Sequence, residues 1–204
     1  LRLLYAVMTR LHGVFRTAPI REFRPQYAGL PEQGKNDHYP ADTGFGYPEK
    51  GRIDLTTDDG RTLSVTPDLR INFVYVPQGN TLLSGTIREN LWLGSPGADE
   101  EALHKVIRLA CAEFVFSLPE GLDQDREHGY GLSEGQAQRI AIARALLRPG
   151  RIWLFDEASS ALDTETTTHL MDNLLQWGKN NTLIFVTHDS RLMERCDQVI
   201  HIKE

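Results

Sequence analysis

The sequence has few cysteines, no excess of positive charge and no long hydrophobic run. Its two cysteines, Cys111 and Cys196, stand far apart in 204 residues, which predicts free buried thiols in a reducing compartment, not a disulfide or a metal site. The net charge of -6 gives no general attraction for nucleic acid or anionic lipid. Every apolar run is shorter than the roughly 18 to 20 residues of a membrane span, and no signal-peptide pattern is visible.

The organisation of the chain changes near residue 50. In residues 16–50, prolines and arginines are spread without a helical or strand period, which predicts a loop or a disordered segment. We therefore divide the chain into an anomalous segment, residues 1–50, and a well-organised domain, residues 51–204. Because the sequence starts with Leu1 and ends inside an apolar alternation, we expect a piece of a longer polypeptide.

Three short apolar runs each end in polar residues. They are NFVYVPQ (72–78), RIWLFDE (151–157) and TLIFVTHD (182–189), and their continuous apolar character predicts strands buried on both faces of a sheet. In a parallel sheet, ligands bind beyond the carboxyl ends of the strands. We expect four side chains to gather at that edge: Gln78, Asp156, Glu157 and His188.

Helical patterns alternate with these runs, which indicates the α/β class. Residues 100–118 carry an apolar stripe of helical period, and residues 164–180 carry another. In residues 131–150, Ser133 and Gln136 fit a capping box at a helix start, and Pro149 and Gly150 end the helix.

Each motif has a chemical and a purely structural interpretation. An acidic residue at a strand end can hold Mg²⁺ through water, and a second carboxylate can polarise an attacking water. A serine-capped helix start offers backbone N–H groups to an anion. Alternatively, the acids are merely solvated, the helix is merely well capped, His188 is hydrogen-bonded and Gln78 lies in a turn. The order and spacing of all four motifs together favour a nucleotide site.

These motifs resemble the nucleotide-binding domain of ABC transporters over residues 51–204. GLSEGQAQRIAIARALL resembles the signature helix, RIWLFDEASSALD the Walker B strand with the D-loop, and FVTHD the switch-histidine region. YVPQGNTLLSGTIRENL and LPEGLDQDREHGYGLSEGQ resemble exporter-type members. The resemblance implies a P-loop NTPase-like, mostly parallel sheet with a helical subdomain that carries the signature.

The resemblance also implies ATP and Mg²⁺ as cofactors and assigns roles to single residues. Asp156 would hold Mg²⁺ through water, Glu157 would be the general base, and His188 would contact the γ-phosphate. Gln78 would sense Mg²⁺ and the attacking water, and would couple the site to the membrane domain.

Further residues would act across a dimer of two such domains, according to the same resemblance. Ser133, Gly135 and Gln136 would reach the γ-phosphate of ATP held by the partner domain, and Asp163 would communicate across the dimer. The implied function is an ATPase at the cytoplasmic face of the inner membrane, working with a fused or separate transmembrane domain and with no nucleic acid. Glu134 departs from the signature, which usually has glycine there, and its charge would weaken closure on phosphate.

The phosphate-binding loop is the serious departure. Residues 29–36, GLPEQGKN, nearly fit the loop pattern, and Gly34 and Lys35 are its candidate phosphate-binding residues. Lys35 lies 43 residues before Gln78, a reasonable spacing for the family. However, Asn36 lacks the hydroxyl for Mg²⁺, and the following DHYPADTG cannot form a buried helix.

A shifted reading frame would explain correct spacing with wrong residues. One choice of codons for residues 34–45, read one base later, encodes Gly-Lys-Thr-Thr-Ile-Thr-Arg-Leu-Ile-Leu-Gly, a loop end and an apolar helix. Residues 30–34 can give Thr-Gly-Ala-Gly in the other frame. Our hypothesis is that the native gene encodes a normal loop and that frame errors affect part of residues 1–45.

Two rival hypotheses stay open: a degenerate regulatory domain that completes only a partner's ATP site, and an unrelated insertion. Tyr5 has about the right spacing for an adenine-stacking residue, although residues 1–11 read equally well as an amphipathic helix. An ABC-type ATPase of DNA repair or chromosome structure is disfavoured by the acidic charge and by the short separation of Gln78 and Ser133, 55 residues.

Overall fold

The computed structural model describes residues 4–9, 54–56, 62–64, 71–125, 131–179 and 181–202. The chain divides into two compact units, one formed by residues 1–11 and 71–204 and the other by residues 12–70. In the second unit the described residues form a hairpin, in which β2 (Asp54–Thr56) pairs antiparallel with β3 (Thr62–Ser64). The division at residue 50 remains a prediction.

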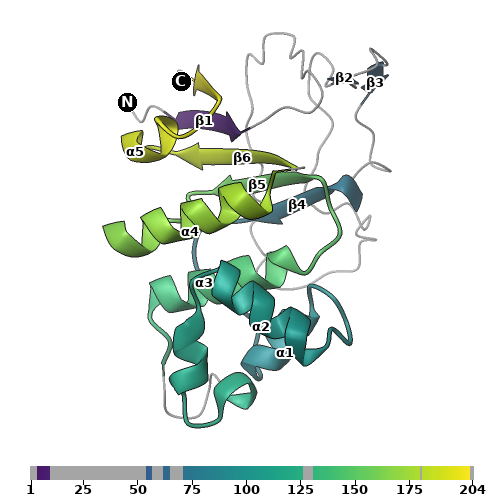
Figure 1. Cartoon of the computed structure of the whole chain (residues 1–204), viewed down its shortest axis with the longest axis vertical. Coiled ribbons are helices and arrows are strands. Elements are labelled where there is room, and N and C mark those ends of the chain that lie inside the picture. The colour runs from purple at the N-terminus through teal and green to yellow at the C-terminus, as the bar shows by residue number, and fades with distance from the viewer. Residues whose placement is uncertain are drawn as a thin grey trace, which may run out of the picture. The chain divides into compact units, whose positions relative to one another are not determined.

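A five-stranded sheet organises the first unit, in the order β4-β5-β6-β1-β7 (Figure 1). β4 (Phe73–Val76), β5 (Ile152–Asp156) and β6 (Thr182–Thr187) are parallel, as their apolar runs predict. β1 (Leu4–Thr9) lies antiparallel between β6 and β7 (Gln198–Ile202). The α/β fold with a parallel sheet at the site is therefore confirmed.

Residues 4–9 form a strand, so the helical interpretation of residues 1–11 is wrong. Tyr5 pairs with Thr187 and Thr9 pairs with Leu183, which means that β1 runs against β6. The chain therefore leaves β1 at Thr9, beside Leu183, which is the end of β6 away from Thr187. Residues 4–9 are extended because their backbone pairs with β6 on one side and β7 on the other. The apolar pattern of six residues alone does not distinguish a strand from a helix.

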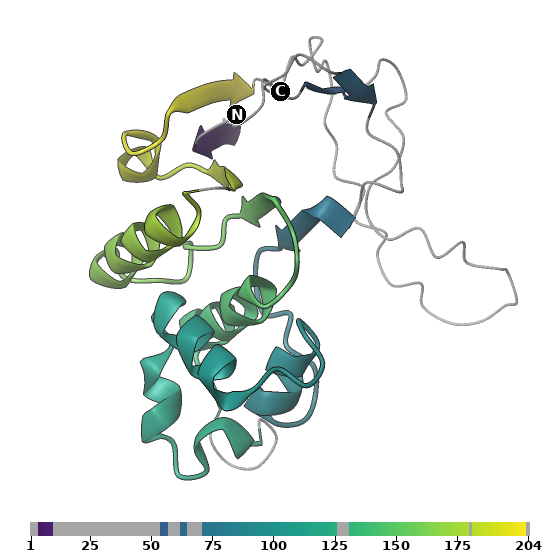
Figure 2. The same cartoon turned by 45° about the vertical axis from the view of Figure 1, so that its right-hand side comes forward.

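Helix α3 lies between the sheet and two shorter helices (Figures 1 and 2). Among the described residues the helices are α1 (Ile87–Trp92), α2 (Glu100–Leu109), α3 (Glu134–Leu146), α4 (Thr164–Trp177) and α5 (Ser190–Met193), with 3-10 turns at Glu113–Ser117 and Gly121–Asp123. None of these helices is long and apolar enough to cross a membrane. The expected helices at 131–150 and 164–180 are thus confirmed, with slightly shorter bounds.

The helix expected over residues 100–118 is interrupted after Leu109. Cys111 has a positive φ of 53°, which ends α2, and a 3-10 turn follows. The carbonyl oxygens at this end find donors on other helices. Arg139 Nη1 donates to the Cys111 carbonyl at 2.6 Å, and Asn173 Nδ2 donates to the Leu109 carbonyl at 3.2 Å. These contacts replace the helical hydrogen bonds that the break removes.

The core fills one face of the sheet. Trp153 and Phe155 are each 1% exposed on that face. Trp153 meets Trp177 of α4 edge-to-face with ring centroids 4.6 Å apart, and Phe155 stacks on Phe185 of β6 at 4.9 Å. Together the rings join the middle strands to α4.

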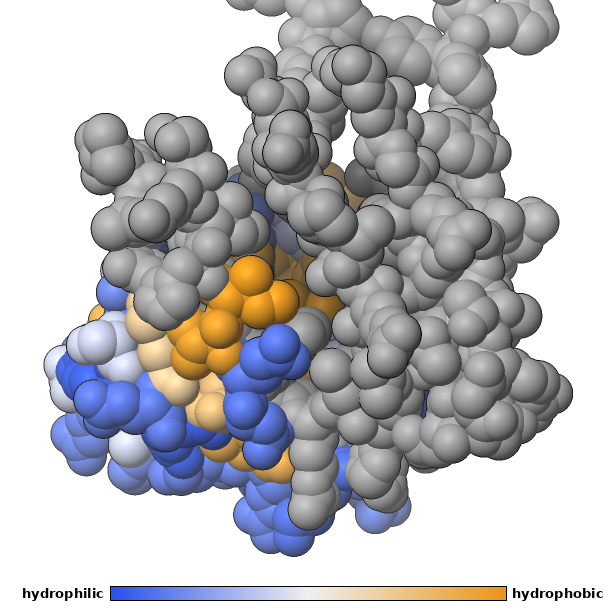
Figure 3. Space-filling view, turned by 90° about the horizontal axis from the view of Figure 1, so that it is seen from above, coloured by the Kyte–Doolittle hydropathy of each residue, from blue (hydrophilic) through white to orange (hydrophobic). Residues whose placement is uncertain are grey.

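On the other face of the sheet the described side chains range from buried to exposed, so burial of the strands on both faces is confirmed only in part: Ile152 is 8% and Thr182 7% exposed. Tyr75 is 39% exposed, and Leu154, Ile184 and Val186 are only partly buried. Seen from above, the described surface carries some hydrophobic residues beside hydrophilic ones (Figure 3). A buried second face needs an apolar helix, and the polar sequence DHYPADTG after Lys35 cannot provide one.

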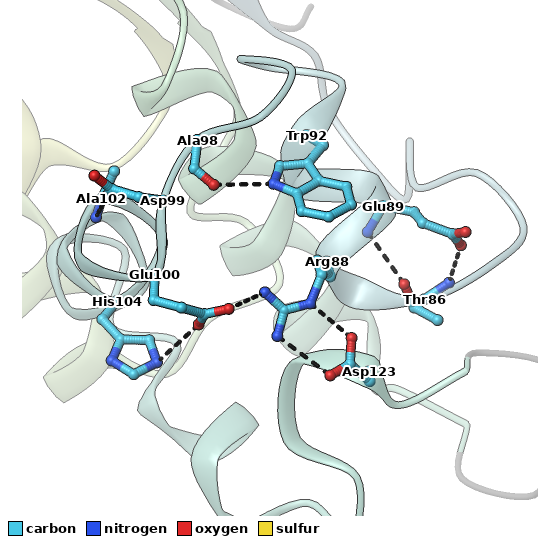
Figure 4. A network of polar contacts seen from close by, with 10 residues as sticks. All are labelled: Thr86, Arg88, Glu89, Trp92, Ala98, Asp99, Glu100, Ala102, His104 and Asp123. Carbon is cyan, nitrogen blue, oxygen red and sulfur yellow. Dashed lines mark hydrogen bonds and ion pairs between the residues drawn. The ribbon is translucent and has the colours of Figure 1, made fainter.

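Arg88 joins three elements of the helical subdomain (Figure 4). Its Nε donates to Asp123 Oδ1 at 2.6 Å and its Nη2 to Asp123 Oδ2 at 3.2 Å, while Nη1 pairs with Glu100 at the start of α2. The guanidinium also lies 5.7 Å from the ring centroid of Trp92. Because α1 carries Arg88, this network fixes α2 and the segment before the signature relative to α1.

Candidate active site

Three of the predicted site residues meet at the carboxyl edge of the parallel strands. Gln78 follows β4, Glu157 follows β5 and His188 follows β6. Gln78 Nε2 donates to Glu157 Oε2 at 3.1 Å, and His188 Nε2 forms a close contact with Glu157 Oε1. Their expected gathering is confirmed, while their catalytic roles remain predictions.

The backbone of Glu157 has a conformation that is rare for this residue type. Its φ is 45°, and its N–H donates to the Val186 carbonyl at 2.9 Å. The left-handed region costs a non-glycine residue about 1–2 kcal/mol. The hydrogen bond to β6 holds this turn, which aims a side chain that is 15% exposed at Gln78 and His188. Strain of this kind concentrates at functional sites.

Asp156 lies beside this group and is held by a residue that the sequence analysis missed. Tyr75 Oη donates to Asp156 Oδ2 at 2.8 Å. Tyr75 pairs with Leu154 in the parallel register, two positions before Asp156 on the same face. The sequence shows a hydroxyl within an otherwise apolar run, but only the register of β4 and β5 shows that this hydroxyl reaches Asp156.

The described residues fit a magnesium site that substrate completes. None of them form a group of three or more His, Cys, Asp or Glu side chains that could hold a metal ion. Mg²⁺ usually binds through one or two carboxylates together with substrate phosphates and water. One carboxylate, that of Asp156, would therefore be enough on the protein side, and the metal-binding roles of Asp156 and Gln78 stay predictions.

Ser133 caps α3 and forms the predicted capping box with Gln136. Ser133 Oγ accepts from the Gln136 N–H at 3.2 Å, and Gln136 Oε1 accepts from the Ser133 N–H at 2.9 Å. A hydroxyl has one donor and two acceptor positions, so Ser133 can cap the helix and still donate to a phosphate. The amide oxygen of Gln136 accepts within the cap, and its Nε2 is the side-chain atom that can donate to a phosphate.

Gly135 is buried where α3 packs on the segment before Asp163. A Cβ at this position would lie 2.6 Å from the Ala161 carbonyl oxygen and 3.2 Å from a Leu162 methyl. The close approach of two backbones explains glycine at this position without any ligand. A phosphate-binding role for Gly135 stays a prediction.

Asp163 caps α4 with both carboxylate oxygens. Oδ1 accepts from the Thr166 N–H at 2.8 Å, and Oδ2 accepts from Thr166 Oγ1 at 2.7 Å. These bonds, above all that from the Thr166 backbone, lower the pKa of the Asp163 carboxyl below its usual range. The capping role is observed, and communication across a dimer stays a prediction.

The Asp163→Asn variant is expected to lose less stability in acid than the wild type. A lowered native pKa means that Asp163 stabilises the fold above its unfolded pKa and that this contribution disappears as the pH falls through the native pKa. Asparagine caps helices equally well but does not titrate. Denaturant titrations between about pH 5 and pH 2 measure the difference. The same loss of stability with falling pH in the two proteins would contradict the prediction. Glu165→Gln on α4, at an exposed position, is the control.

The two cysteines are free thiols, as predicted. Burial raises the pKa of the Cys196 thiol to about 11, and burial also raises the pKa of Cys111. Both therefore carry little thiolate near neutral pH, and neither is a candidate nucleophile.

Gly34 and Lys35 lie outside the described residues. The described strand that precedes them in the sequence, β1, ends at Thr9 and not immediately before Gly29. A phosphate loop should follow its strand directly. The phosphate-binding roles of Gly34 and Lys35 therefore stay predictions.

Comparison with known proteins decides the family. The pattern that describes the ABC transporter family matches residues 41–160, more than half of the chain. The chain belongs to the ABC transporter family. The match includes Gln78, Ser133 and Glu157, and it begins beyond Gly34 and Lys35.

The relatives of this ABC domain are of exporter type. The chain is 38% identical over 163 residues to the ATP-dependent permease MDL1 of Candida albicans, covering 75% of this chain and 23% of the relative. It is 41% identical over 160 residues to the alpha-hemolysin translocation ATP-binding protein HlyB of Escherichia coli O157:H7, covering 76% and 22%. The chain thus spans about a quarter of the length of these relatives.

A solved structure, a bacterial Atm1-family ABC exporter with ATP bound, resembles the fold with a TM-score of 0.65. It is 35% identical, and the likeness covers 74% of this chain and 27% of that one. This supports the exporter type and the P-loop NTPase-like fold of the ABC domain.

Proposed function

We propose that this domain binds and hydrolyses ATP to power an ABC membrane transporter. The meeting of Gln78, Glu157 and His188 beside Asp156 carries this proposal, because it gathers a base, polar donors and a metal-binding carboxylate at one sheet edge. The exporter-type relatives favour transport over DNA-repair functions. The domain would work at the cytoplasmic face of the inner membrane.

The geometry suggests how each residue acts. Glu157 accepts a proton from the attacking water, and Gln78, 3.1 Å from Glu157 Oε2, orients that water with it. His188 approaches the other carboxylate oxygen and can donate to the γ-phosphate. Asp156, fixed by Tyr75, would hold the water shell of Mg²⁺, and the metal ion would supply charge neutralisation at the phosphates.

Two partners are implied by the proposal. A second nucleotide-binding domain would offer its ATP to Ser133, Gly135 and Gln136, whose positions at the start of α3 suit an anion. Glu134 in the same turn adds a negative charge that weakens this contact. A transmembrane domain, fused or separate, would receive the movement through the Gln78 segment.

The phosphate loop decides between an active domain and the alternative, a regulatory domain that completes only its partner's site. Two observations fit a loop altered by frame errors. The family match begins at residue 41, after Gly34 and Lys35, and Tyr75 on the sheet face that an apolar helix should cover is 39% exposed. Sequencing the coding DNA across residues 1–50 tests the frame hypothesis directly, and confirmed codons would eliminate it.

Steady-state hydrolysis tests the function itself. We define the loop-restored chain as the one in which the segment 30–45 is replaced by the other-frame sequences given above, and all other residues keep their numbers. Its rate of ATP hydrolysis should rise more steeply than linearly with protein concentration, because each site needs two domains. A loop-restored chain that folds and binds ATP but never hydrolyses it would overturn the ATPase proposal and favour the regulatory alternative.

A further inference from the structure

Side chains of helix α3 form hydrogen bonds to the segment that carries Gln78 at two points. Gln138 Nε2 donates to the Pro77 carbonyl at 3.2 Å. Arg144 Nη1 donates to the Thr81 carbonyl at 3.0 Å, and Nη2 donates to Thr81 Oγ1 at 2.9 Å. Since Pro77 and Thr81 flank Gln78, the two contacts hold the segment on either side of it.

Burying the polar side chains of Gln138 and Arg144 costs free energy. Gln138 is 2% exposed, and its Oε1 has no hydrogen-bond partner in the described part of the chain. Burial, with a contribution from Arg148, lowers the pKa of the Arg144 guanidinium. Apolar residues could pack α3 on β4 without these costs. The polar groups therefore indicate a purpose beyond packing.

The other end of α3 carries the signature serine. Ser133 is the N-cap, and Gly135 packs directly on the Ala161 carbonyl. The helix continues without a break from Glu134 to Leu146 and passes along β4 (Figure 2). A displacement of its first turn must therefore move Gln138 and Arg144 as well.

We propose that Gln138 and Arg144 are positioning residues through which α3 couples Ser133 to Gln78. When Ser133 meets the nucleotide of the partner domain, α3 shifts, and the two contacts reposition Gln78 at the chain's own Glu157. One domain would thereby sense ATP at the partner's site and adjust its own. The coupling rests on the proposed function only in placing Ser133 at a partner's ATP.

Hydrogen exchange on the isolated chain tests whether Gln138 and Arg144 hold the segment around Gln78. In Gln138→Leu and in Arg144→Met, amides of residues 78–83 should exchange about tenfold faster, within the usual range of coupling effects. Gln176→Leu on α4 and Arg151→Met, both exposed positions, are matched controls and should leave the rate unchanged. Unchanged exchange in Gln138→Leu and Arg144→Met would overturn the proposal, whether or not the chain binds ATP.

Kinetics of the hydrolysing dimer tests the coupling. Gln138→Leu should lower kcat about tenfold with KM nearly unchanged, and it should add nothing in a Gln78→Ala background, because it acts through Gln78. A full additional loss in that background would overturn the coupling. If the loop-restored dimer without further substitutions shows no hydrolysis, the proposed function fails, and the exchange experiment alone tests the two contacts.

Discussion

Replacing Glu157 by glutamine in the loop-restored chain should lower the rate of ATP hydrolysis by about 10²- to 10⁴-fold. Glutamine keeps the shape of the side chain and can still bond Gln78 and His188, but it cannot accept the proton of the attacking water. ATP affinity should stay close to that of the loop-restored chain, because Glu157 is proposed to act on the attacking water and not to bind ATP itself. Phosphate release and equilibrium ATP binding measure the two effects separately.

Two controls make this prediction specific. Glu165→Gln, in the first turn of α4, makes the same chemical change at an exposed position and should leave turnover unchanged. Glu157→Asp shortens the side chain, so it should also lose most activity if the position of the carboxylate matters. Full turnover in Glu157→Gln would show that another group is the base.

Replacing Gly135 by alanine should destabilise the domain even though alanine favours helices. The gain in helix propensity is about 1 kcal/mol. Against it stands a Cβ placed 2.6 Å from the Ala161 carbonyl oxygen, a backbone atom that can move only with the segment that leads to Asp163. Overpacking of this kind typically costs about 1–3 kcal/mol, so the net effect should be a loss.

Urea unfolding of Gly135→Ala measures this loss. Gly131→Ala is the matched control, because a Cβ there would meet no atom within 4 Å. Greater stability of Gly135→Ala would mean that the contact between α3 and Ala161 is looser than the structure shows. The variant should also impair dimer closure, since it displaces Ser133 or Asp163.

Much of the site could be predicted because its residues follow buried strands. Continuous apolar runs fixed the parallel strands, and parallel strands place Gln78, Glu157 and His188 at one edge. The capping box of Ser133 and Gln136 likewise depends on local spacing alone. Such features follow from short-range physics, which a single sequence contains.

The mistaken expectations depended on contacts distant in the sequence. The break after Leu109 is stabilised by Arg139 and Asn173, which belong to other helices. Residues 4–9 are a strand because β6 and β7 leave a slot between them. The bond from Tyr75 to Asp156 depends on the register of two strands. Periodicity within a segment cannot reveal these pairings.

Equilibrium binding of Mg-ATP to the present chain and to the loop-restored chain tests the account most directly. The account holds that the site formed by Gln78, Glu157 and His188 is intact and that residues 29–36 fail as a phosphate loop. Loss of two or more charge-assisted phosphate contacts, each about 1.5–3 kcal/mol, predicts affinity at least about 100-fold weaker in the present chain. Equal affinities for the two chains would contradict the account.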